Sequence, residues 1–251
     1  MNNLALEQLL NQTLNATAIA DYAPNGLQVE GKATVQKIIT GVTASQALID
    51  YAVSQHADAI LVHHGYFWKS ENPCIRGMKG KRIKTLLLND INLYGYHLPL
   101  DVHPKLGNNA QLAALLGIEN LQPLSDEKMS IPVYGELRTP LTGEELAHRI
   151  TQLLGRTPLV CSDNVSPLIR TVGICTGGGQ GYIDLAAAKG IDAFITGEVS
   201  EQTIHSAREQ GIHFFACGHH ATERYGVKAL GEWLAAEYGF EVKFKDIDNP
   251  A

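Results

Sequence analysis

The sequence predicts an α/β fold made of two similar α/β domains, and three observations support this prediction. Strand-like and helix-like segments alternate along most of the 251 residues, which is the pattern of βαβ units around a largely parallel sheet. The order of the segments in the first half recurs in the second half. Histidines and carboxylates also stand where apolar runs end, and ligands in open α/β sheets bind beyond the carboxyl ends of the strands.

The first half contains four expected helices and three expected strands. KIITGVT is rich in β-branched residues, and DAILVHH and INLYGYH are apolar runs that end in histidine. Asn108 or Asn109 is the expected N-cap of the fourth helix, because an Asn side chain can accept a hydrogen bond from the first turn. The expected helices cover residues 6–15, 45–56, 80–90 and 107–117, and the expected strands cover 37–43, 58–64 and 91–97.

The second half repeats this order after an added segment. Residues 130 to 170 contribute a strand at 131–137, a helix at 145–155 and a short apolar run at 158–161. The sequence GGGQ then opens the first repeated helix, and the last strand follows a long helical pattern. The repeated strands are expected at 171–176, 192–198, 213–220 and 240–247, and the repeated helices at 181–190, 200–211 and 223–239.

A constant shift of 134 residues aligns the two halves, which indicates an internal duplication. Shared βαβ composition is the alternative explanation, but the matching order of elements favours duplication. We therefore expect a domain of residues 1–125 and a domain of residues 126–251, related by a pseudo-twofold, with a metal site in the cleft between them. The shift pairs Gln46 with Gln180, Ile49 with Ile183, Asp50 with Asp184, Ala52 with Ala186, Asp58 with Asp192, Ala59 with Ala193 and His64 with Glu198.

Composition excludes several classes of protein. A hydrophobic content of 45% is enough for ordinary cores, but no apolar stretch approaches the roughly 20 residues that cross a bilayer. The N-terminal residues do not resemble a signal peptide, so we expect a cytoplasmic protein. The formal charge of −6 argues against broad capture of nucleic acid. The four cysteines (Cys74, Cys161, Cys175 and Cys217) lack close pairing and are expected to be buried, reduced thiols.

Five residues are candidate ligands for a pair of divalent metal ions: His63, His64, Asp101, His219 and Glu223. A lone buried histidine is usually structural, but two adjacent histidines at a strand end can reach two different ions where the chain turns at the following glycine. His219 and Glu223 are four residues apart at the start of a helical pattern, so they can share one helix face. The favourable position of an acid in a first helical turn is the competing explanation for Glu223.

His97 and Asp101 follow the third apolar run, on either side of Pro99, which disfavours helix at Leu98. In an extended chain their Cα atoms would lie roughly 13 Å apart. Of these two residues, we therefore expect Asp101 to bind metal, because a carboxylate can bridge two cations. We expect His97 to transfer protons or to support the ligands. This donor set fits zinc, iron or manganese, and two such ions can generate a nucleophile from water and polarise a substrate oxygen.

Three further features have alternative explanations. The basic patch of Lys69, Arg76, Lys79, Lys81, Arg82 and Lys84 could meet phosphates or form a solvated helix face. The aromatic run from Tyr66 to Trp68 could stack on a base, pack in a core or form a subunit interface. The sequence TGGGQ at 176–180 could approach a phosphate or form a plain tight turn.

These residues in this order resemble the GTP cyclohydrolase I type 2 homologues, also called NGG-interacting-factor-three-like proteins. The resemblance spans nearly the whole chain, although Gly65 stands where many relatives have proline. It implies two α/β domains, two metal ions bound by the five residues named above, and a toroidal homohexamer built from dimers. The family name implies opening of the guanine ring of GTP by water. The supporting motifs are PNGLQVEG at 24–31, VHHG at 62–65, HLPLD at 97–101, ITGE at 195–198 and GHHATE at 218–223.

The leading functional hypothesis is a metal-dependent hydrolase that acts on a nucleotide or a related small molecule, with His97 as its candidate acid or base. The alternative is a non-catalytic metal-binding scaffold or a metal-handling protein that uses the same ligands. A third hypothesis, a ring that acts on nucleic acid, is disfavoured by the acidic net charge. A catalytic site should keep an open coordination position, whereas a storage site tends to be closed.

Overall fold

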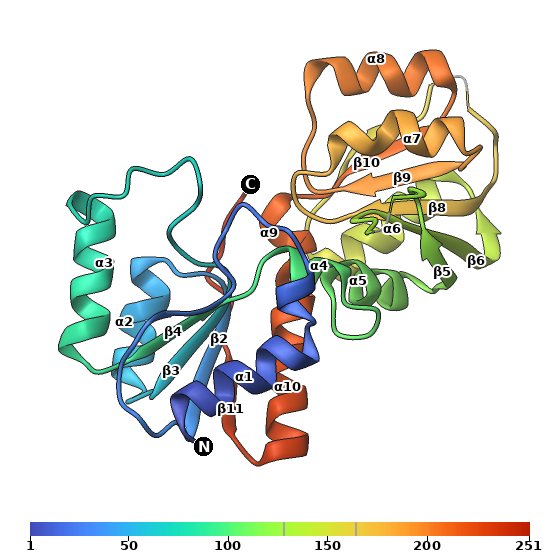
Figure 1. Ribbon diagram of the computed structural model, residues 1–251. Helices are drawn as coiled ribbons and strands as arrows, with labels where there is room; N and C mark the ends of the chain where they lie inside the picture. Colours follow the sequence, from blue (N-terminus) through green and yellow to red (C-terminus); the bar gives the residue numbers. More distant parts are fainter. Residues whose placement is uncertain (128, 164) are drawn as a thin grey trace. The chain divides into compact units, whose positions relative to one another are not determined.

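The computed structural model describes residues 1–127, 129–163 and 165–251, and its strands form two sheets. The predicted α/β class is confirmed. The chain divides into two compact units (Figure 1). The first unit contains Met1–Gly107 and Gly226–Asp248, and the second contains Asn108–Tyr225 and Asn249–Ala251.

The first unit is built on a sheet with the strand order β1-β4-β3-β2-β11. Strands β2, β3, β4 and β11 run parallel through successive pairs, and β1 pairs antiparallel with β4 at one edge. Its strands are β1 (Gly26–Val29), β2 (Lys37–Thr43), β3 (Ala59–His64), β4 (Asn92–Gly95) and β11 (Glu241–Phe244). Its helices are α1 (Asn3–Thr13), η1 (Ala16–Ala18), α2 (Gln46–Ser54), α3 (Gly77–Leu88), α4 (Leu98–Val102) and α10 (Arg224–Tyr238), whose first two residues belong to the second unit.

Helices cover both faces of this sheet, with α1 and α10 on one face and α2 and α3 on the other (Figure 1). Successive strand residues point to opposite faces, so Ile38 packs with α1 and α10 while Ile39 packs with α2 and α3. A strand buried on both faces must be apolar throughout, which explains the continuous apolar runs in the sequence. Two side-chain caps begin the helices that flank β2, from Asn2 at α1 and from Ser45 at α2.

The second unit contains a sheet with the order β5-β6-β8-β9-β10-β7, in which β8, β9 and β10 are parallel. Helices α5 and α6 share one core with this sheet, and α7 and α8 share another. Its strands are β5 (Ile118–Pro123), β6 (Val133–Leu141), β7 (Leu159–Cys161), β8 (Ile169–Cys175), β9 (Ala193–Thr196) and β10 (His213–Ala216). Its helices are α5 (Asn108–Leu116), α6 (Gly143–Leu154), η2 (Gln180–Tyr182), α7 (Ile183–Ala188), α8 (Glu201–Gln210) and α9 (His219–Thr222).

The division of the chain differs from the expected boundary at 125. The first unit already ends at Gly107, and the chain returns to it at Gly226. The physical reason is that α10 supplies Val227, Leu230 and Leu234 to the first unit's core and that β11 pairs with β2. The polar stretch at 122–130, where the boundary was expected, begins in the last two residues of β5 and lies inside the second unit. Lys128 in this stretch lies outside the described residues.

Three local expectations also need correction. Leu98 begins α4 although a proline follows it, because Pro99 lies in the first turn, where an intrahelical N–H bond is not required. Asn109 does not cap α5: the residue lies within the helix, and its side chain accepts a hydrogen bond from Thr176 N and donates one to Ile131 O, both outside the helix. Cys74 is exposed, while the other three cysteines are buried and all four are free.

Each unit contains the same local arrangement of one carboxylate and two backbone N–H groups. Asp58 accepts hydrogen bonds through Oδ2 from the N–H groups of Gln36 and Lys37, at 2.9 and 2.8 Å. Asp192 does the same for Arg170 and Thr171, at 2.9 Å each.

The strand registers agree as well, since Ile38 pairs with Ala59 and Val172 pairs with Ala193. Each of these residues is 134 positions from its counterpart, so the repeat extends to backbone hydrogen bonds.

Candidate metal centre

The first unit brings three histidine side chains together at the carboxyl ends of its parallel strands. His63 and His64 end β3, and His97 follows β4, which is the neighbour of β3 in the sheet. One ligand atom from each of the three lies within 4.8 Å of the others. The ring centroids of His63 and His64 are 4.5 Å apart, and those of His63 and His97 are 5.2 Å apart. The expected clustering at this sheet edge is therefore present within the first unit.

Neighbouring groups orient two of these rings through Nδ1. His63 is buried and donates from Nδ1 to the carbonyl oxygen of Tyr96 at 3.0 Å. This bond places the proton on Nδ1, so Nε2 carries the lone pair in the neutral ring. The Nδ1 atom of His64 lies 3.2 Å from Thr43 Oγ1, at the end of the adjacent strand β2. Such bonds to the outer nitrogen are typical of metal-binding histidines.

Asp101 lies close to His63 because the chain after His97 is helical. One turn of α4 brings the buried Asp101 side chain to the sheet edge, where its Oδ1 is 3.5 Å from His63 Nε2. The extended geometry that was expected to separate His97 from Asp101 does not occur. A carboxylate beside an imidazole Nε2 is a suitable pair of donors for one divalent ion.

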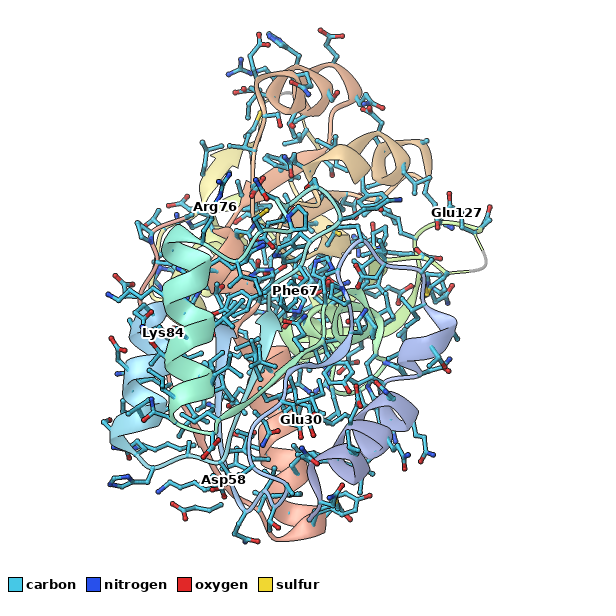
Figure 2. All side chains as sticks on the ribbon, turned by 60° about the vertical axis from the view of Figure 1, so that its left-hand side comes forward. Glu30, Asp58, Phe67, Arg76, Lys84 and Glu127 are labelled. Carbon is cyan, nitrogen blue, oxygen red and sulfur yellow. The ribbon has the colours of Figure 1, made fainter. Side chains whose placement is uncertain are left out.

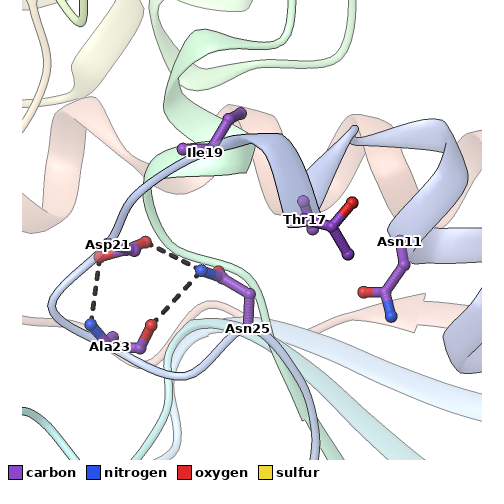
Figure 3. Close-up of a pocket in the computed structure, with 7 residues that line it drawn as sticks. Asn11, Thr17, Ile19, Asp21, Ala23 and Asn25 are labelled. Carbon is purple, nitrogen blue, oxygen red and sulfur yellow. Dashed lines mark hydrogen bonds between the residues drawn. The ribbon is translucent and has the colours of Figure 1, made fainter.

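His97 is held by a buried carboxylate that the sequence patterns did not indicate. Its Nδ1 donates to Asp21 Oδ1 at 2.9 Å, and its backbone N–H donates to Asn25 Oδ1 at 2.8 Å. Asp21 also accepts from Leu98 N, Tyr22 N, Ala23 N and Asn25 Nδ2. Figure 3 shows the hydrogen bonds that join Asp21 to Ala23 and to Asn25, three of the residues that line a pocket of about 260 Å³.

This network changes the acidity of Asp21. Burial raises the pKa of the carboxyl group, but hydrogen bonds from His97 and Asn25 and the nearby charge of His97 outweigh it and lower the pKa from 3.8 to about 2. Asp21 is therefore ionised at neutral pH. Its charge fixes the His97 ring with the proton on Nδ1.

The second unit carries its own cluster, formed by His219, Glu223 and Glu198. His219 begins α9, and Glu223 follows that helix four residues later. His219 Nε2 lies 3.2 Å from Glu223 Oε2, and its Nδ1 donates to Glu198 Oε1 at 2.7 Å. Glu198 follows β9, the neighbour of β10 in the sheet, so adjacent strands supply the groups. The predicted i, i+4 contact between His219 and Glu223 is confirmed.

Two carboxylates around one imidazole stabilise its charged form. Burial lowers the pKa of His219, but hydrogen bonds and charge from Glu223 and then Glu198 outweigh it and raise the pKa to about 9. The ring is thus protonated at neutral pH when these carboxylates are its neighbours. A cation that takes the place of the proton at Nε2 would find the same negative charges around it.

The TGGGQ sequence supplies space beside this cluster. Gly177 has a φ of +65°, and a Cβ atom there would lie 2.0 Å from Glu223 Oε1 and 3.0 Å from His219 Nε2. Its carbonyl oxygen accepts hydrogen bonds from Gly197 N and Glu198 N. The glycine therefore lets the backbone approach the two side chains closely, which a plain tight turn would not require.

The other features singled out in the sequence lie in the first unit. Figure 2 labels two residues of the basic patch, Arg76 immediately before α3 and Lys84 on that helix, and both are exposed. Lys79 is buried instead and donates to Asn72 O. Tyr66 is buried, whereas Trp68 is partly exposed and has its ring centroid 4.9 Å from that of His97.

Sequence reasoning missed Asp21, Asn25 and Thr43 as partners of the histidines, and it placed Glu198 near the site without giving it a role. The PNGLQVEG motif was the available signal for Asn25, since it includes that residue and begins three positions after Asp21. The described residues contain no helix with both the length and the apolar character needed to cross a membrane.

Comparisons with known proteins agree with this fold. The family model described as Duf34/NIF3 (NGG1p interacting factor 3) matches residues 1–250. A Pasteurella multocida (strain Pm70) protein named GTP cyclohydrolase 1 type 2 homolog is 80% identical, with 100% of both chains covered. The solved structure of protein ybgI is 64% identical with a TM-score of 0.96, and that of TTHA1606 from Thermus thermophilus is 35% identical with a TM-score of 0.89; each comparison covers 100% of both chains. The chain therefore belongs to the Duf34/NIF3 family.

Proposed function

We propose that this protein is a metal-dependent hydrolase of a nucleotide-like small molecule and that its two units jointly hold two divalent ions. The proposed ligands are His63, His64 and Asp101 from the first unit and His219 and Glu223 from the second. The proposal includes a pseudo-twofold relation of the units with the ions in a cleft between them. Two features that occur in both units support that relation: an aspartate that accepts hydrogen bonds from backbone N–H groups, and the pairing register of two parallel strands.

One observation carries the proposal. All three proposed ligand histidines are held through Nδ1: His63 and His219 donate Nδ1–H to a carbonyl or carboxylate oxygen, at 3.0 and 2.7 Å, and His64 Nδ1 lies 3.2 Å from a threonine hydroxyl oxygen. Histidines that bind metals are usually held in this way, because the outer bond fixes the tautomer and leaves Nε2 for the ion. A packed core without such a function would not need three imidazoles whose Nδ1 atoms are each held by a neighbouring oxygen atom.

The donor chemistry fits the proposed ions. Three imidazoles and two carboxylates without a thiolate suit zinc, iron or manganese, and five donors exceed what one tetrahedral site requires. When bound, a pair of divalent ions supplies a nucleophile from water and polarises a substrate oxygen.

In the reaction, His97 would move a proton to or from the substrate at Nε2. Asp21 would keep the proton of the resting ring on Nδ1 and stabilise the imidazolium that forms when Nε2 accepts a proton. Glu198 would hold the His219 ring in the same way. The nucleotide class follows from the name of the Pasteurella multocida relative, which refers to GTP cyclohydrolase.

Elemental analysis of protein purified without chelator tests the metal claim. We expect two ions per chain after reconstitution with zinc, manganese or ferrous iron, and reduced metal content in Asp101→Asn and Glu223→Gln variants. His220→Gln is the matched control, because His220 lies beside His219 on α9 but is not a proposed ligand. A content that never exceeds one ion per chain would contradict the dinuclear centre.

A second measurement tests catalysis on the metal-replete protein. GTP, other nucleotides, phosphoesters and cyclic amides are screened for turnover, and His97→Ala is expected to reduce turnover of the identified substrate by about 10² to 10⁴-fold at unchanged metal content. Equal turnover by parent and variant would make His97 structural. Full metal content without turnover of any compound would favour a metal-binding scaffold or metal-handling protein.

We also propose that the chain assembles into a toroidal homohexamer of dimers, as the family resemblance implies. Sedimentation velocity at micromolar concentration should then give a single species of six chains. A monomer under these conditions would contradict the proposal.

A further inference from the structure

We propose that Tyr22 and Trp68 form a binding surface for the planar heteroaromatic ring of a small molecule, beside His64 and His97. The inference deepens the proposed function, because it names the part of the substrate that the first unit would recognise. All four residues belong to the first unit.

The two aromatic rings border the histidine cluster directly. The Trp68 ring centroid lies 4.9 Å from that of His97 and 5.9 Å from that of His64. The Tyr22 centroid lies 4.9 Å from that of His97, and the two aromatic centroids are 5.8 Å apart with an interplanar angle of 35°. The spacing of Tyr22 and Trp68 is too short for a third ring to enter between them. A ligand ring would therefore stack on an outer face.

Trp68 differs from the two aromatic residues before it. Tyr66 is buried and donates its hydroxyl proton to Ala44 O at 2.6 Å, and Phe67 packs against the core that includes α2 and α3. Phe67 and Trp68 are both partly buried, but the Trp68 ring borders the histidines, and Tyr22 is 54% exposed. Solvent exposure of two large aromatic residues beside polar imidazoles is not explained by core packing.

The loops that carry the two rings are fixed to each other. Lys69 N donates to Tyr22 O at 2.8 Å, which joins the loop after β3 to the loop before β1. Gln28 holds the other end of the Trp68 loop by accepting a hydrogen bond from Tyr66 N at 2.7 Å. A Cβ atom at Gly65 would lie 2.1 Å from Gln28 Oε1, so a glycine there allows this bond. The surface is therefore preorganised, which reduces the entropic cost of binding.

The backbone before Trp68 also adopts an uncommon conformation. Phe67 has a φ of +65°, which is unfavourable for a bulky side chain, and its N–H donates to Glu71 Oε2 at 2.9 Å. Backbone strain of this kind is concentrated at functional sites, where the surrounding structure maintains it. Here Phe67 packs against the core while the Trp68 ring lies beside those of His64 and His97.

Stacking chemistry identifies the ligand class. Indole and phenol rings stack well on heteroaromatic rings, and the contribution depends little on which base is stacked. A ring on this surface would lie next to His97, the proposed proton carrier. A nucleobase has the required planar ring, whereas a sugar phosphate does not.

Fluorescence can test the proposal because the chain has only two tryptophans, Trp68 and Trp233. Trp233→Phe protein, in which Trp68 is the only tryptophan, is titrated with GMP, guanosine, ribose 5-phosphate and inorganic phosphate, with excitation at the red edge of tryptophan absorption. We expect saturable quenching by GMP and guanosine only. Trp68→Phe protein, in which only Trp233 remains, is the matched control and should show no quenching.

Affinity provides the second readout. The affinity of Tyr22→Leu for GMP is measured by Trp68 fluorescence in the Trp233→Phe background. The affinity of Trp68→Leu, which lacks this signal, is measured by equilibrium dialysis with labelled GMP. Either substitution should raise Kd by about 5- to 150-fold, the range expected for loss of one base stack. Circular dichroism verifies that each variant is folded.

Three results would overturn the inference: no saturable quenching by either guanine compound, equal affinity in the variants and the parent, or quenching by ribose 5-phosphate alone. A Trp68→Leu protein with parental affinity but altered sedimentation would identify the surface as a subunit contact instead. The metal measurements are independent of these results. Stacking without metal binding would defeat only the proposed function, and metal-dependent turnover without stacking would defeat only this inference.

Discussion

At the scale of single residues, outer hydrogen-bond partners organise the candidate centre. The orientation of each ring depends on a hydrogen bond from its Nδ1: His63 bonds to Tyr96 O, His97 to Asp21 and His219 to Glu198. The sequence indicates the histidines through their position after apolar runs, but it gives no periodic signal for a carboxylate in a loop. Asp21 therefore could not be found from pattern alone. Its role depends on a contact across 76 positions.

Asp21 allows a prediction about pH and stability. Its pKa is lowered from 3.8 to about 2 in the folded protein, so the ionised carboxylate stabilises the fold above pH 3.8 and this stabilisation is lost as the pH falls toward 2. Asp21→Asn should lower the free energy of unfolding at neutral pH by about 2 kcal/mol. Urea denaturation at a series of pH values measures the difference.

The difference in the free energy of unfolding between the parent and Asp21→Asn should shrink steadily below pH 4. Asp50→Asn is the control, because Asp50 is exposed on α2 and accepts its hydrogen bond from Gln46 on the same helix. A deficit for Asp21→Asn that stays constant from pH 7 to the acid limit would show that the ionised carboxylate is not the source of the stability.

At the scale of elements, the apolar runs predicted strands more reliably than they predicted the turns between them. β2 has the expected limits at 37 and 43, since its residues are buried on both sides and leave a continuous apolar signal. Helix α4 was not expected, because the rule for residues before proline opposes helix at Leu98. Contacts with the first unit's core, including the buried Leu100, override that local preference.

The turn after β8 allows a prediction at the element scale. Gly177→Ala places a Cβ atom 2.0 Å from Glu223 Oε1 at a φ of +65°, so the carboxylate or the turn must move. Displacement of a proposed ligand should weaken metal binding by about 10- to 100-fold, as happens when outer partners of ligands are lost. Competition with a chelator of known affinity measures this effect.

Gly181→Ala is the matched control for Gly177→Ala, because an added Cβ there would have no neighbour within 4 Å. It lies four residues away, in η2, and should leave metal affinity unchanged. Equal affinities for Gly177→Ala and the parent would mean that the close approach of this turn does not position Glu223 for metal.

At the scale of the whole molecule, the sequence predicted two α/β units but not how the chain is divided between them. Alternating patterns describe each element and its faces, whereas the sheet that accepts a helix is decided by long-range packing. α10 and β11 occur last in the sequence, yet they complete the first unit. The shift of 134 residues nevertheless found real counterparts, since Asp58 and Asp192 each hold two backbone N–H groups.

This division predicts the behaviour of fragments. A fragment of residues 1–125 should not fold, because it lacks α10, whose Val227, Leu230 and Leu234 are buried in the first unit's core, and lacks the β11 partner of β2. Burial of each such side chain contributes about 1.5 to 3 kcal/mol, so the loss approaches the whole stability of a typical domain. A chain that joins residues 1–107 to 226–248 through a flexible linker should instead unfold cooperatively in urea. Cooperative unfolding of the 1–125 fragment, with hydrogen-exchange protection in β2, would show that the first unit does not require the returning segment.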